Sequence, residues 1–156
     1  MDVSIRRVGT GDAVQLAELL RGMAWFDVLR SQTLEDSVAQ VEKRIRQCLA
    51  DDSHSIYVAE RSEGKIAGYG SVHWLPYLFM SGPEGYVSEL FVGAEARGQS
   101  VGRRLLDAIE SEARARGCQR LSLINLRSRE SYQRQFYPKA GWSERSDAAN
   151  FIYALT

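Results

Sequence analysis

The chain has 156 residues, and its 20 lysines and arginines balance its 20 aspartates and glutamates. This length suffices for one domain with its own core, so we expect residues 1–156 to form a single domain. Zero formal net charge argues against a general nucleic-acid binder. The N-terminus is polar and no long apolar run occurs, so we expect a cytoplasmic protein without a membrane segment. The two cysteines have neither metal-ligand nor redox spacing, so we expect no metal site.

Short strands and amphipathic helices alternate in the first half of the chain. Residues 3–8 are typical of a strand, and Asp12 is a candidate cap for a helix that ends near residue 22. A capping-box pattern begins a second predicted helix over residues 33–49. Two predicted strands then follow, at residues 55–61 and 65–74, with a short turn containing glycine between them.

The second half continues this pattern and ends in strands. Its predicted elements are a strand at 87–92, a helix over 101–117, a strand at 121–124, a helix over 128–139 whose last turn Pro138 distorts, and closing strands at 142–145 and 150–155. This order predicts an α/β fold with a mixed sheet and helices on both faces.

Residues 97–106 have the composition of an anion-binding turn. They follow an apolar strand and open a helix, whose first turn has unpaired backbone N–H groups and the positive end of the macrodipole. Small residues allow close approach of a phosphate, and three arginines add forked donors: Arg97, Arg103 and Arg104. An ordinary solvated helix N-terminus is the alternative. The spacing matches neither a P-loop nor a dinucleotide fingerprint.

A second segment, residues 135–142, reads Gln-Phe-Tyr-Pro-Lys-Ala-Gly-Trp. Together with Arg97-x-x-Ser100-x-Gly102, it resembles the GNAT superfamily of acyl-CoA-dependent N-acyltransferases. That family's turn is usually Arg/Gln-x-x-Gly-x-Gly/Ala, and its later helix commonly ends Phe-Tyr-x-x-x-Gly-Phe, with Trp142 here in the final place. The order of elements fits over nearly the full length.

The resemblance implies a single-domain GNAT-type fold with a mostly antiparallel sheet of about six to seven strands. It also implies acetyl-CoA as the acyl donor, with no metal. The fourth strand would splay from the fifth and expose its backbone to the pantetheine arm. The implied cofactor-binding residues are Leu90, Phe91, Val92, Arg97, Gly98, Gln99, Ser100, Val101, Gly102, Arg103 and Asn125.

Two residues are candidates for proton transfer. Tyr137 is the candidate general acid, because the departing sulfur needs a proton and a nearby phenol can supply one; the alternative is an aromatic that packs beside Phe136. Glu89 is the candidate base for the acceptor ammonium, on a strand face that we expect it to share with Val87 and Phe91; pairing with an arginine is the alternative. A backbone N–H such as that of Leu90 would meet the oxyanion.

Ser100 departs from the family pattern, which usually has glycine at this position. A helical N-terminal position accommodates serine, so we expect any cost to be steric and the hydroxyl to be available to a phosphate. Glu130 also departs, because many relatives have asparagine there.

The predicted function is N-acetyl transfer from acetyl-CoA to a primary amine of a small molecule, by direct attack. Residues 23–32 and 75–83 are the expected acceptor region, and its aromatic side chains either line a pocket or pack in the core. A non-catalytic acyl-CoA sensor, a protein or peptide N-acetyltransferase, and an unrelated phosphate-binding α/β enzyme are the alternatives. Dimerisation is common in the family, and the sequence leaves it open.

Overall fold

The computed structural model describes all residues from Met1 to Thr156. Contacts divide the chain into two compact units, Met1–Ile124 and Asn125–Thr156. The first unit contains the whole sheet and four α-helices, and the second contains two short helices. The single-domain organisation stays a prediction.

The sheet confirms the predicted α/β class. Its strands are β1 (Val3–Arg7), β2 (His54–Arg61), β3 (Ile66–Leu75), β4 (Glu84–Val92) and β5 (Arg120–Leu123). They lie side by side in chain order. The first three pairs are antiparallel and β4 pairs with β5 in parallel, so the sheet is mixed and mostly antiparallel as expected. It has five strands, fewer than the predicted six to seven.

The missing strands are those predicted at residues 142–145 and 150–155, which form no regular secondary structure. A strand requires a neighbour whose backbone groups it can pair with. These segments pair with no strand, and the side chains of Phe151 and Tyr153 are 90% and 86% exposed. The prediction of strands at these two segments was therefore wrong.

The helix predicted over residues 128–139 is interrupted. It forms two short helices, α5 (Glu130–Gln133) and α6 (Phe136–Lys139), separated at Gln135, whose φ is 57°. Pro138 explains the break, because proline has no N–H to donate one turn back and its ring would collide with that carbonyl. Starting α6 at Phe136 places Pro138 in the first turn, where no such bond is needed.

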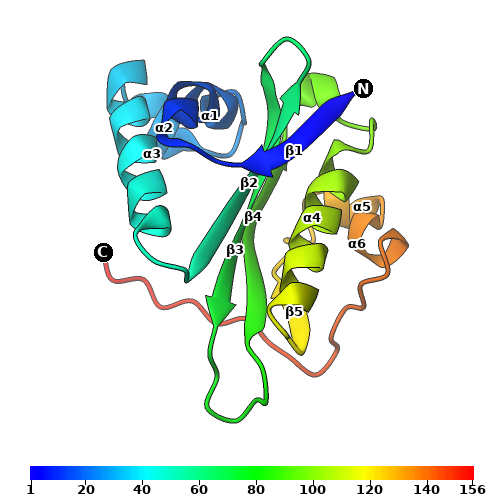
Figure 1. Ribbon diagram of the computed structural model, residues 1–156. Helices are drawn as coiled ribbons and strands as arrows, with labels where there is room; N and C mark the ends of the chain where they lie inside the picture. The colour runs from blue at the N-terminus through cyan, green and yellow to red at the C-terminus, as the bar shows by residue number, and fades with distance from the viewer. The chain divides into compact units, whose positions relative to one another are not determined.

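The helices of the first unit lie on both sides of the sheet (Figure 1). They are α1 (Ala13–Arg21), α2 (Asp27–Ser31), α3 (Leu34–Leu49) and α4 (Val101–Ala115), with single turns η1 (Thr10–Asp12) and η2 (Ala94–Ala96). The predicted start of α3 is confirmed: the Thr33 hydroxyl accepts a hydrogen bond from the Asp36 N–H at 3.1 Å. Helix α2 was not predicted.

Alternation along the strands gives the sheet two different faces. On β2, Ile56 and Val58 pack in a core cluster with residues of α1 and α3. Ser55 and Tyr57 alternate with them in sequence and contact α4 instead. We call these the α1/α3 face and the α4 face.

Helix α4 buries one apolar stripe completely. Leu105, Leu106 and Ile109 have no exposed surface. The helix can approach because β3 has glycine beneath it: a Cβ built on Gly70 would lie 3.1 Å from Ile109 Cδ1. A side chain at this position would therefore push the helix outward.

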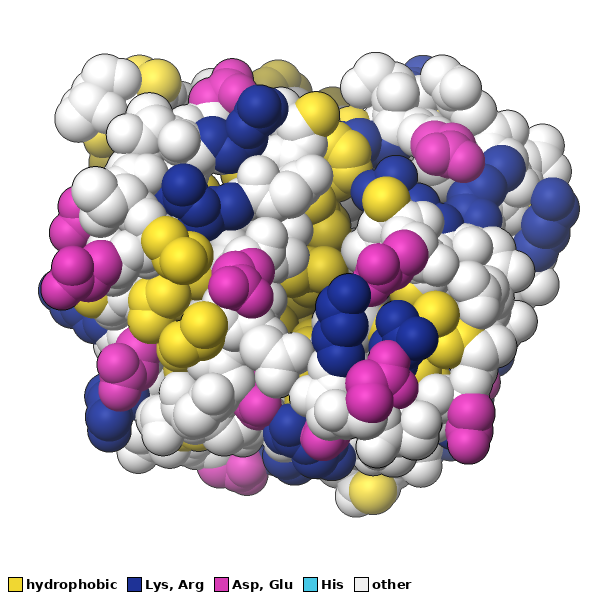
Figure 2. Space-filling model, turned by 90° about the horizontal axis from the view of Figure 1, so that it is seen from above, with side chains coloured by type: hydrophobic (Ala, Val, Ile, Leu, Met, Phe, Trp, Pro, Cys, Tyr) yellow, Lys and Arg dark blue, Asp and Glu magenta, His cyan; other side chains and the backbone are white.

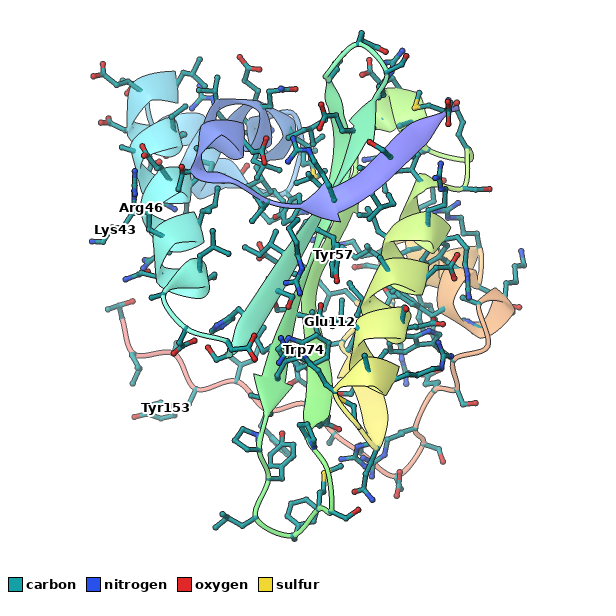
Figure 3. All side chains as sticks on the ribbon, in the orientation of Figure 1. Lys43, Arg46, Tyr57, Trp74, Glu112 and Tyr153 are labelled. Atoms are coloured by element: carbon teal, nitrogen blue, oxygen red, sulfur yellow. The ribbon has the colours of Figure 1, made fainter.

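A polar cluster around Glu112 fixes the C-terminal half of α4 to the sheet. Tyr57, Trp74 and Glu112 lie together between β2, β3 and α4 (Figure 3). The Glu112 carboxylate accepts hydrogen bonds from the Tyr57 hydroxyl at 2.8 Å, the Ser55 hydroxyl at 3.0 Å and Arg116 Nε at 3.0 Å. Burial alone would raise the pKa of Glu112, but these hydrogen bonds outweigh it and lower the pKa.

The surface carries both signs of charge. Acidic and basic side chains are interspersed on the face that Figure 2 shows, as the balanced composition requires. None of the helices is both long enough and apolar enough to cross a bilayer.

Truncating the centre of α4 should destabilise the protein strongly. Leu105→Ala is expected to lower the free energy of unfolding by about 2–5 kcal/mol, because it leaves a cavity in a closed site. Leu78 is fully exposed, so Leu78→Ala should change it by less than about 0.5 kcal/mol. Urea denaturation checks both, and equal effects would contradict this account of the core.

Candidate active site

The predicted anion-binding turn lies between β4 and α4. After β4 ends at Val92, the turn η2 (Ala94–Ala96) leads into residues 97–100, which are all exposed. Two of these residues have left-handed backbone: Gly98 with φ 73° and Ser100 with φ 64°. The chain thereby folds tightly just before α4 begins at Val101.

This turn is suited to an anion. The first backbone hydrogen bond of α4 joins the Arg104 N–H to the Ser100 carbonyl at 3.0 Å, and no side chain caps the helix. The N–H groups before Arg104 thus lie outside the ladder of α4. A Cβ built on Gly98 meets no atom within 4 Å, so the backbone is open there. The turn thus has the open backbone N–H groups that an anion-binding site needs, and its ligand stays a prediction.

The side chains of the turn are engaged with the protein itself. Arg97 Nε donates to the Val92 carbonyl at 3.3 Å, and Gln99 Nε2 donates to the Glu95 carbonyl at 2.8 Å. Arg103 forms an ion pair with Asp107 at 2.7 Å, so part of its charge is balanced within α4. The backbone, more than these side chains, is the open part of the turn.

Ser100 corrects an expectation about this turn. We expected serine to be conformationally tolerated and its cost to be steric, but its φ of 64° lies in the left-handed region. The cost is therefore conformational, because a Cβ disfavours this region by about 1–2 kcal/mol per residue. This also explains why glycine suits the position.

The edge of β4 is partly released from β5. The parallel pairing runs from Glu84 to Val87, and beyond this point β4 continues to Val92 paired with β3. Beyond Val87, β4 has no strand on the side of β5, because β5 itself ends at Leu123; the splaying of the two strands stays a prediction. Leu90 and Val92 pack in the core cluster on the α4 side, whereas Phe91 packs in the cluster on the α1/α3 side.

An irregularity in β4 decides where Glu89 lies. Val87 is opposite Val72, but Glu89 is opposite Ser71, so Ser88 is an extra residue that forms a β-bulge. Opposite residues share a face, and Ser71 and Val72 are consecutive. Our expectation that Glu89 shares a face with Val87 was therefore wrong, because the bulge moves Glu89 to the α1/α3 face with Phe91.

The Glu89 carboxylate lies in a crowded but accessible place. It accepts a hydrogen bond from the Tyr69 hydroxyl at 2.9 Å. The residue is exposed, yet nearby protein atoms partly desolvate the carboxyl group. This desolvation raises the pKa of Glu89, while the Tyr69 hydrogen bond opposes the rise. Solvent reaches a carboxylate that the protein surrounds, which is the arrangement a proton acceptor needs.

Aromatic rings adjoin Glu89 on the same face. The Phe91 ring lies 5.8 Å from that of Tyr69, 5.1 Å from that of Phe26 and 6.3 Å from that of Trp25. Phe26 and Trp25 come from the segment between α1 and α2. We call Trp25, Phe26, Tyr69 and Phe91 the aromatic cluster.

A histidine pair lies further along the same face. The rings of His54 and His73 are 4.2 Å apart, and His73 Nε2 is 2.8 Å from the Ser88 hydroxyl. Burial, and then the neighbouring His54, lower the pKa of His73. The pair thus continues a polar row that begins at Glu89 and Ser88.

The other two predicted site residues belong to the second unit. The Asn125 Oδ1 accepts a hydrogen bond from the Ser131 hydroxyl at 3.0 Å. Tyr137 is half-buried, with the Trp142 ring 6.0 Å from its own. Burial raises the pKa of Tyr137 to about 12, so the phenol keeps its proton at neutral pH.

Glu89, the part of β4 beyond β5 and the turn before α4 all belong to the first unit, within residues 88–100, whereas Asn125 and Tyr137 belong to the second. Sequence reasoning missed two features: the bulge at Ser88, which sets the position of Glu89, and Tyr69, whose hydrogen bond opposes the rise in the pKa of Glu89 that desolvation causes. Alternation in β3 gave the only available signal for Tyr69. A bulge without glycine has no comparable signal.

The cysteines and acidic groups suggest no other catalytic centre. Cys48 and Cys118 are free, and burial raises the pKa of each thiol, which disfavours the nucleophilic thiolate. No group of three or more His, Cys, Asp or Glu side chains has an arrangement that could hold a metal ion.

Substitutions at Ser100 should separate strain from hydroxyl chemistry. Ser100→Gly is expected to be more stable than Ser100→Ala by about 1 kcal/mol, because only glycine adopts this backbone without cost. If the hydroxyl also donates to the pyrophosphate, both variants should bind CoA more weakly to the same extent. Thermal unfolding and calorimetric titration with CoA check these points, and an alanine variant as stable as the glycine variant would contradict the first.

Known proteins resemble the chain in sequence and in fold. It is 28% identical over 134 residues to IAA acetyltransferase of Azospirillum brasilense, covering 76% of this chain and 84% of that protein. It is also 28% identical over 123 residues to aminoglycoside N(6′)-acetyltransferase type 1 of Stenotrophomonas maltophilia, covering 76% and 72% of the two chains.

A similar fold occurs in a transcriptional regulator from Bacillus halodurans C-125, with a TM-score of 0.83 and 22% identity over 97% of this chain and all of that one. The sequence model of the acetyltransferase (GNAT) family matches residues 22–142, which hold the sheet from β2 onward, the anion-binding turn and the Tyr137 motif. The chain belongs to the GNAT family of acetyltransferases.

Proposed function

We propose that this acetyltransferase moves an acetyl group from acetyl-CoA to the primary amine of a small molecule, by direct attack and without an acyl-enzyme. The observation that carries the proposal is the bulge at Ser88. It places the Glu89 carboxylate on the α1/α3 face of β4, beside the part of this strand that β5 leaves. An acceptor amine bound on this face would meet a base next to the predicted divergence of the two strands.

The turn before α4 would hold the cofactor. Backbone N–H groups of residues 98–103 would bind the pyrophosphate, and Leu90 to Val92 together with Asn125 would contact the pantetheine arm. When bound, acetyl-CoA supplies the acetyl thioester. The N–H of Leu90 would donate a hydrogen bond to the thioester carbonyl oxygen, which stabilises negative charge there.

Glu89 would prepare the acceptor. An ammonium cannot attack until it loses a proton, and the Glu89 carboxylate, directly or through a water molecule, accepts that proton. Its raised pKa supports the role, because a stronger base takes the proton more readily.

Tyr137 would act on the departing sulfur. Its high pKa keeps the hydroxyl protonated, so it is available as a donor. The same shift makes Tyr137 a weaker acid than an ordinary tyrosine, so it would first donate a hydrogen bond to the sulfur, and its proton would move only as the sulfur gains negative charge.

The proposal of a small-molecule acceptor is based on the relatives of the chain and on its net charge. Aminoglycoside N(6′)-acetyltransferase, by its name, acts on a small amine. A basic protein tail would favour an acidic surface, whereas this chain has zero net charge. A non-catalytic acyl-CoA sensor and a protein acetyltransferase are the competing functions.

Removal of either proton-transfer group should slow the reaction. Glu89→Gln and Tyr137→Phe are each expected to lower kcat about 10²–10⁴-fold, the usual contribution of general acid–base catalysis. The KM for acetyl-CoA should change little, because neither group is assigned to binding. Thiol release in steady-state assays with a primary amine measures both constants.

If both variants turn over like the unmodified enzyme, the assigned roles are wrong. If CoA binds but no amine is ever acetylated, the sensor function replaces the catalytic one. Calorimetric titration with CoA separates that outcome from a protein that has unfolded.

The pH profile should depend on Tyr69. Below the pKa of Glu89, kcat/KM for the amine should fall more steeply, because the carboxyl group is then protonated as well as the amine. The Tyr69 hydrogen bond stabilises the charged carboxylate, so Tyr69→Phe should raise the pKa of Glu89 further and move the steeper region to higher pH. A shift to lower pH, or the same steep region in Glu89→Gln, would contradict the assignment of Glu89 as base.

A further inference from the structure

The surroundings of Glu89 contain information on the acceptor that the family does not supply. Desolvation dominates the shift in the pKa of Glu89, the Tyr69 hydroxyl opposes it, and no cation contributes. Many other carboxylates of the chain, such as Asp12, Glu84 and Asp107, are ion-paired with arginine. Glu89 is therefore a partly desolvated anion that an ammonium group would complement.

Beside this carboxylate the protein presents ring surface. Phe91 is two residues from Glu89 on the same face, and Tyr69 contacts both. Phe26 meets Phe91 edge to face with centroids 5.1 Å apart, and Trp25 is 5.9 Å from Phe26. Tyr69 is buried in the core, and Phe26 and Phe91 pack against it but are partly exposed. Trp25 is 38% exposed, so one side of the cluster reaches solvent.

Ring surface next to one carboxylate favours a particular kind of amine. An ammonium is attracted both to the carboxylate and to the faces of aromatic rings, and a flat apolar body gains by covering the rest of the rings. The remaining neighbours on this face are neutral or weakly basic: Ser88, His73 and Tyr86.

A polycationic sugar would need several carboxylates to offset the loss of its hydration. On β2, β3 and β4 this face carries Glu60, Glu84 and Glu89. Arginine already pairs with Glu60 and Glu84, which leaves only the Glu89 carboxylate for an acceptor. A neutral polar body would leave its hydroxyl groups against rings that cannot pair with them.

We infer that the acceptor is a monocationic primary amine with a flat apolar body, such as an arylalkylamine, held between Glu89 and the aromatic cluster. The inference rests on the proposed function, and it narrows the acceptor of the same site. It separates this chain from its aminoglycoside-acetylating relative, whose name specifies a polycationic acceptor.

The test compares three amines in the thiol-release assay with acetyl-CoA: 2-phenylethylamine, glucosamine and tobramycin. Glucosamine has one ammonium group, like 2-phenylethylamine, but its body is polar. Tobramycin has a polar body and several ammonium groups. The inference expects kcat/KM for 2-phenylethylamine to exceed each of the others by at least about tenfold, which corresponds to one well-placed apolar or cation–π contact.

Variants then locate the contact. Phe26→Ala and Trp25→Ala should each raise the KM for 2-phenylethylamine about tenfold and leave the KM for acetyl-CoA unchanged. Phe151 is the matched control: its side chain is 90% exposed in the second unit, and its ring takes part in none of the contacts of the aromatic cluster. Phe151→Ala should alter neither constant.

A higher kcat/KM for tobramycin or glucosamine than for 2-phenylethylamine would overturn the inference and leave the proposed function standing. If Phe26→Ala and Trp25→Ala both keep the same preference for 2-phenylethylamine over the other two amines, the inference is overturned as well. Failure to acetylate any of the three, or any other primary amine, would overturn the proposed function itself. Calorimetric titration of each variant with CoA confirms that it is folded.

Discussion

The packing of α4 against the sheet is the constraint on which the rest of the site depends. Leu105 and Ile109 bury completely against strands that have glycine beneath the helix, so the helix lies close to the backbone of β3. The Glu112 cluster fixes the other end of the same helix. Ten residues of α-helix, about 15 Å, separate Glu112 from Gly102 in the anion-binding turn. A rigid helix with both features keeps the turn at a defined distance from β4.

The two faces of the sheet have different proposed roles. The α4 face holds the helix whose N-terminus is suited to a pyrophosphate, and the α1/α3 face holds Glu89 and the aromatic cluster. The end of β4 beyond β5 is shared by both, because Leu90 packs toward α4 and Phe91 toward α1 and α3. A single strand can therefore contact a cofactor with its backbone and an acceptor with its side chains.

Much of the first unit follows from the sequence, since each of its long elements has a strong pattern. The apolar stripe of α4, the Thr33 cap of α3 and the glycine turn between β2 and β3 are local signals, and the structure contains all three. Predictions were wrong where the outcome depends on a partner that the sequence does not name. Residues 150–155 have the composition of a strand, but a strand exists only beside another one.

The residue types of the candidate site could be predicted from the sequence, but the positions of their side chains could not. The turn before α4 was predicted from its sequence motif, and the structure has a turn there. The left-handed backbone of Ser100 was not predicted, because serine usually avoids this conformation. The interruption at Gln135 follows from Pro138 in retrospect, because proline constrains the residues one turn before it. The bulge at Ser88 arises from the register with β3, which no local pattern records.

That bulge has a consequence for how such a site is gained or lost. If β4 paired regularly with β3 here, Ser88 would lie opposite Ser71, and every side chain from Glu89 onward would exchange faces relative to the first half of β4. The Glu89 carboxylate would then face α4, while Leu90 would replace it among the aromatic rings. The chain would keep its whole sequence and would still lose its proposed base. In this strand, the register with β3 is as much a part of the chemistry as the identity of the residues.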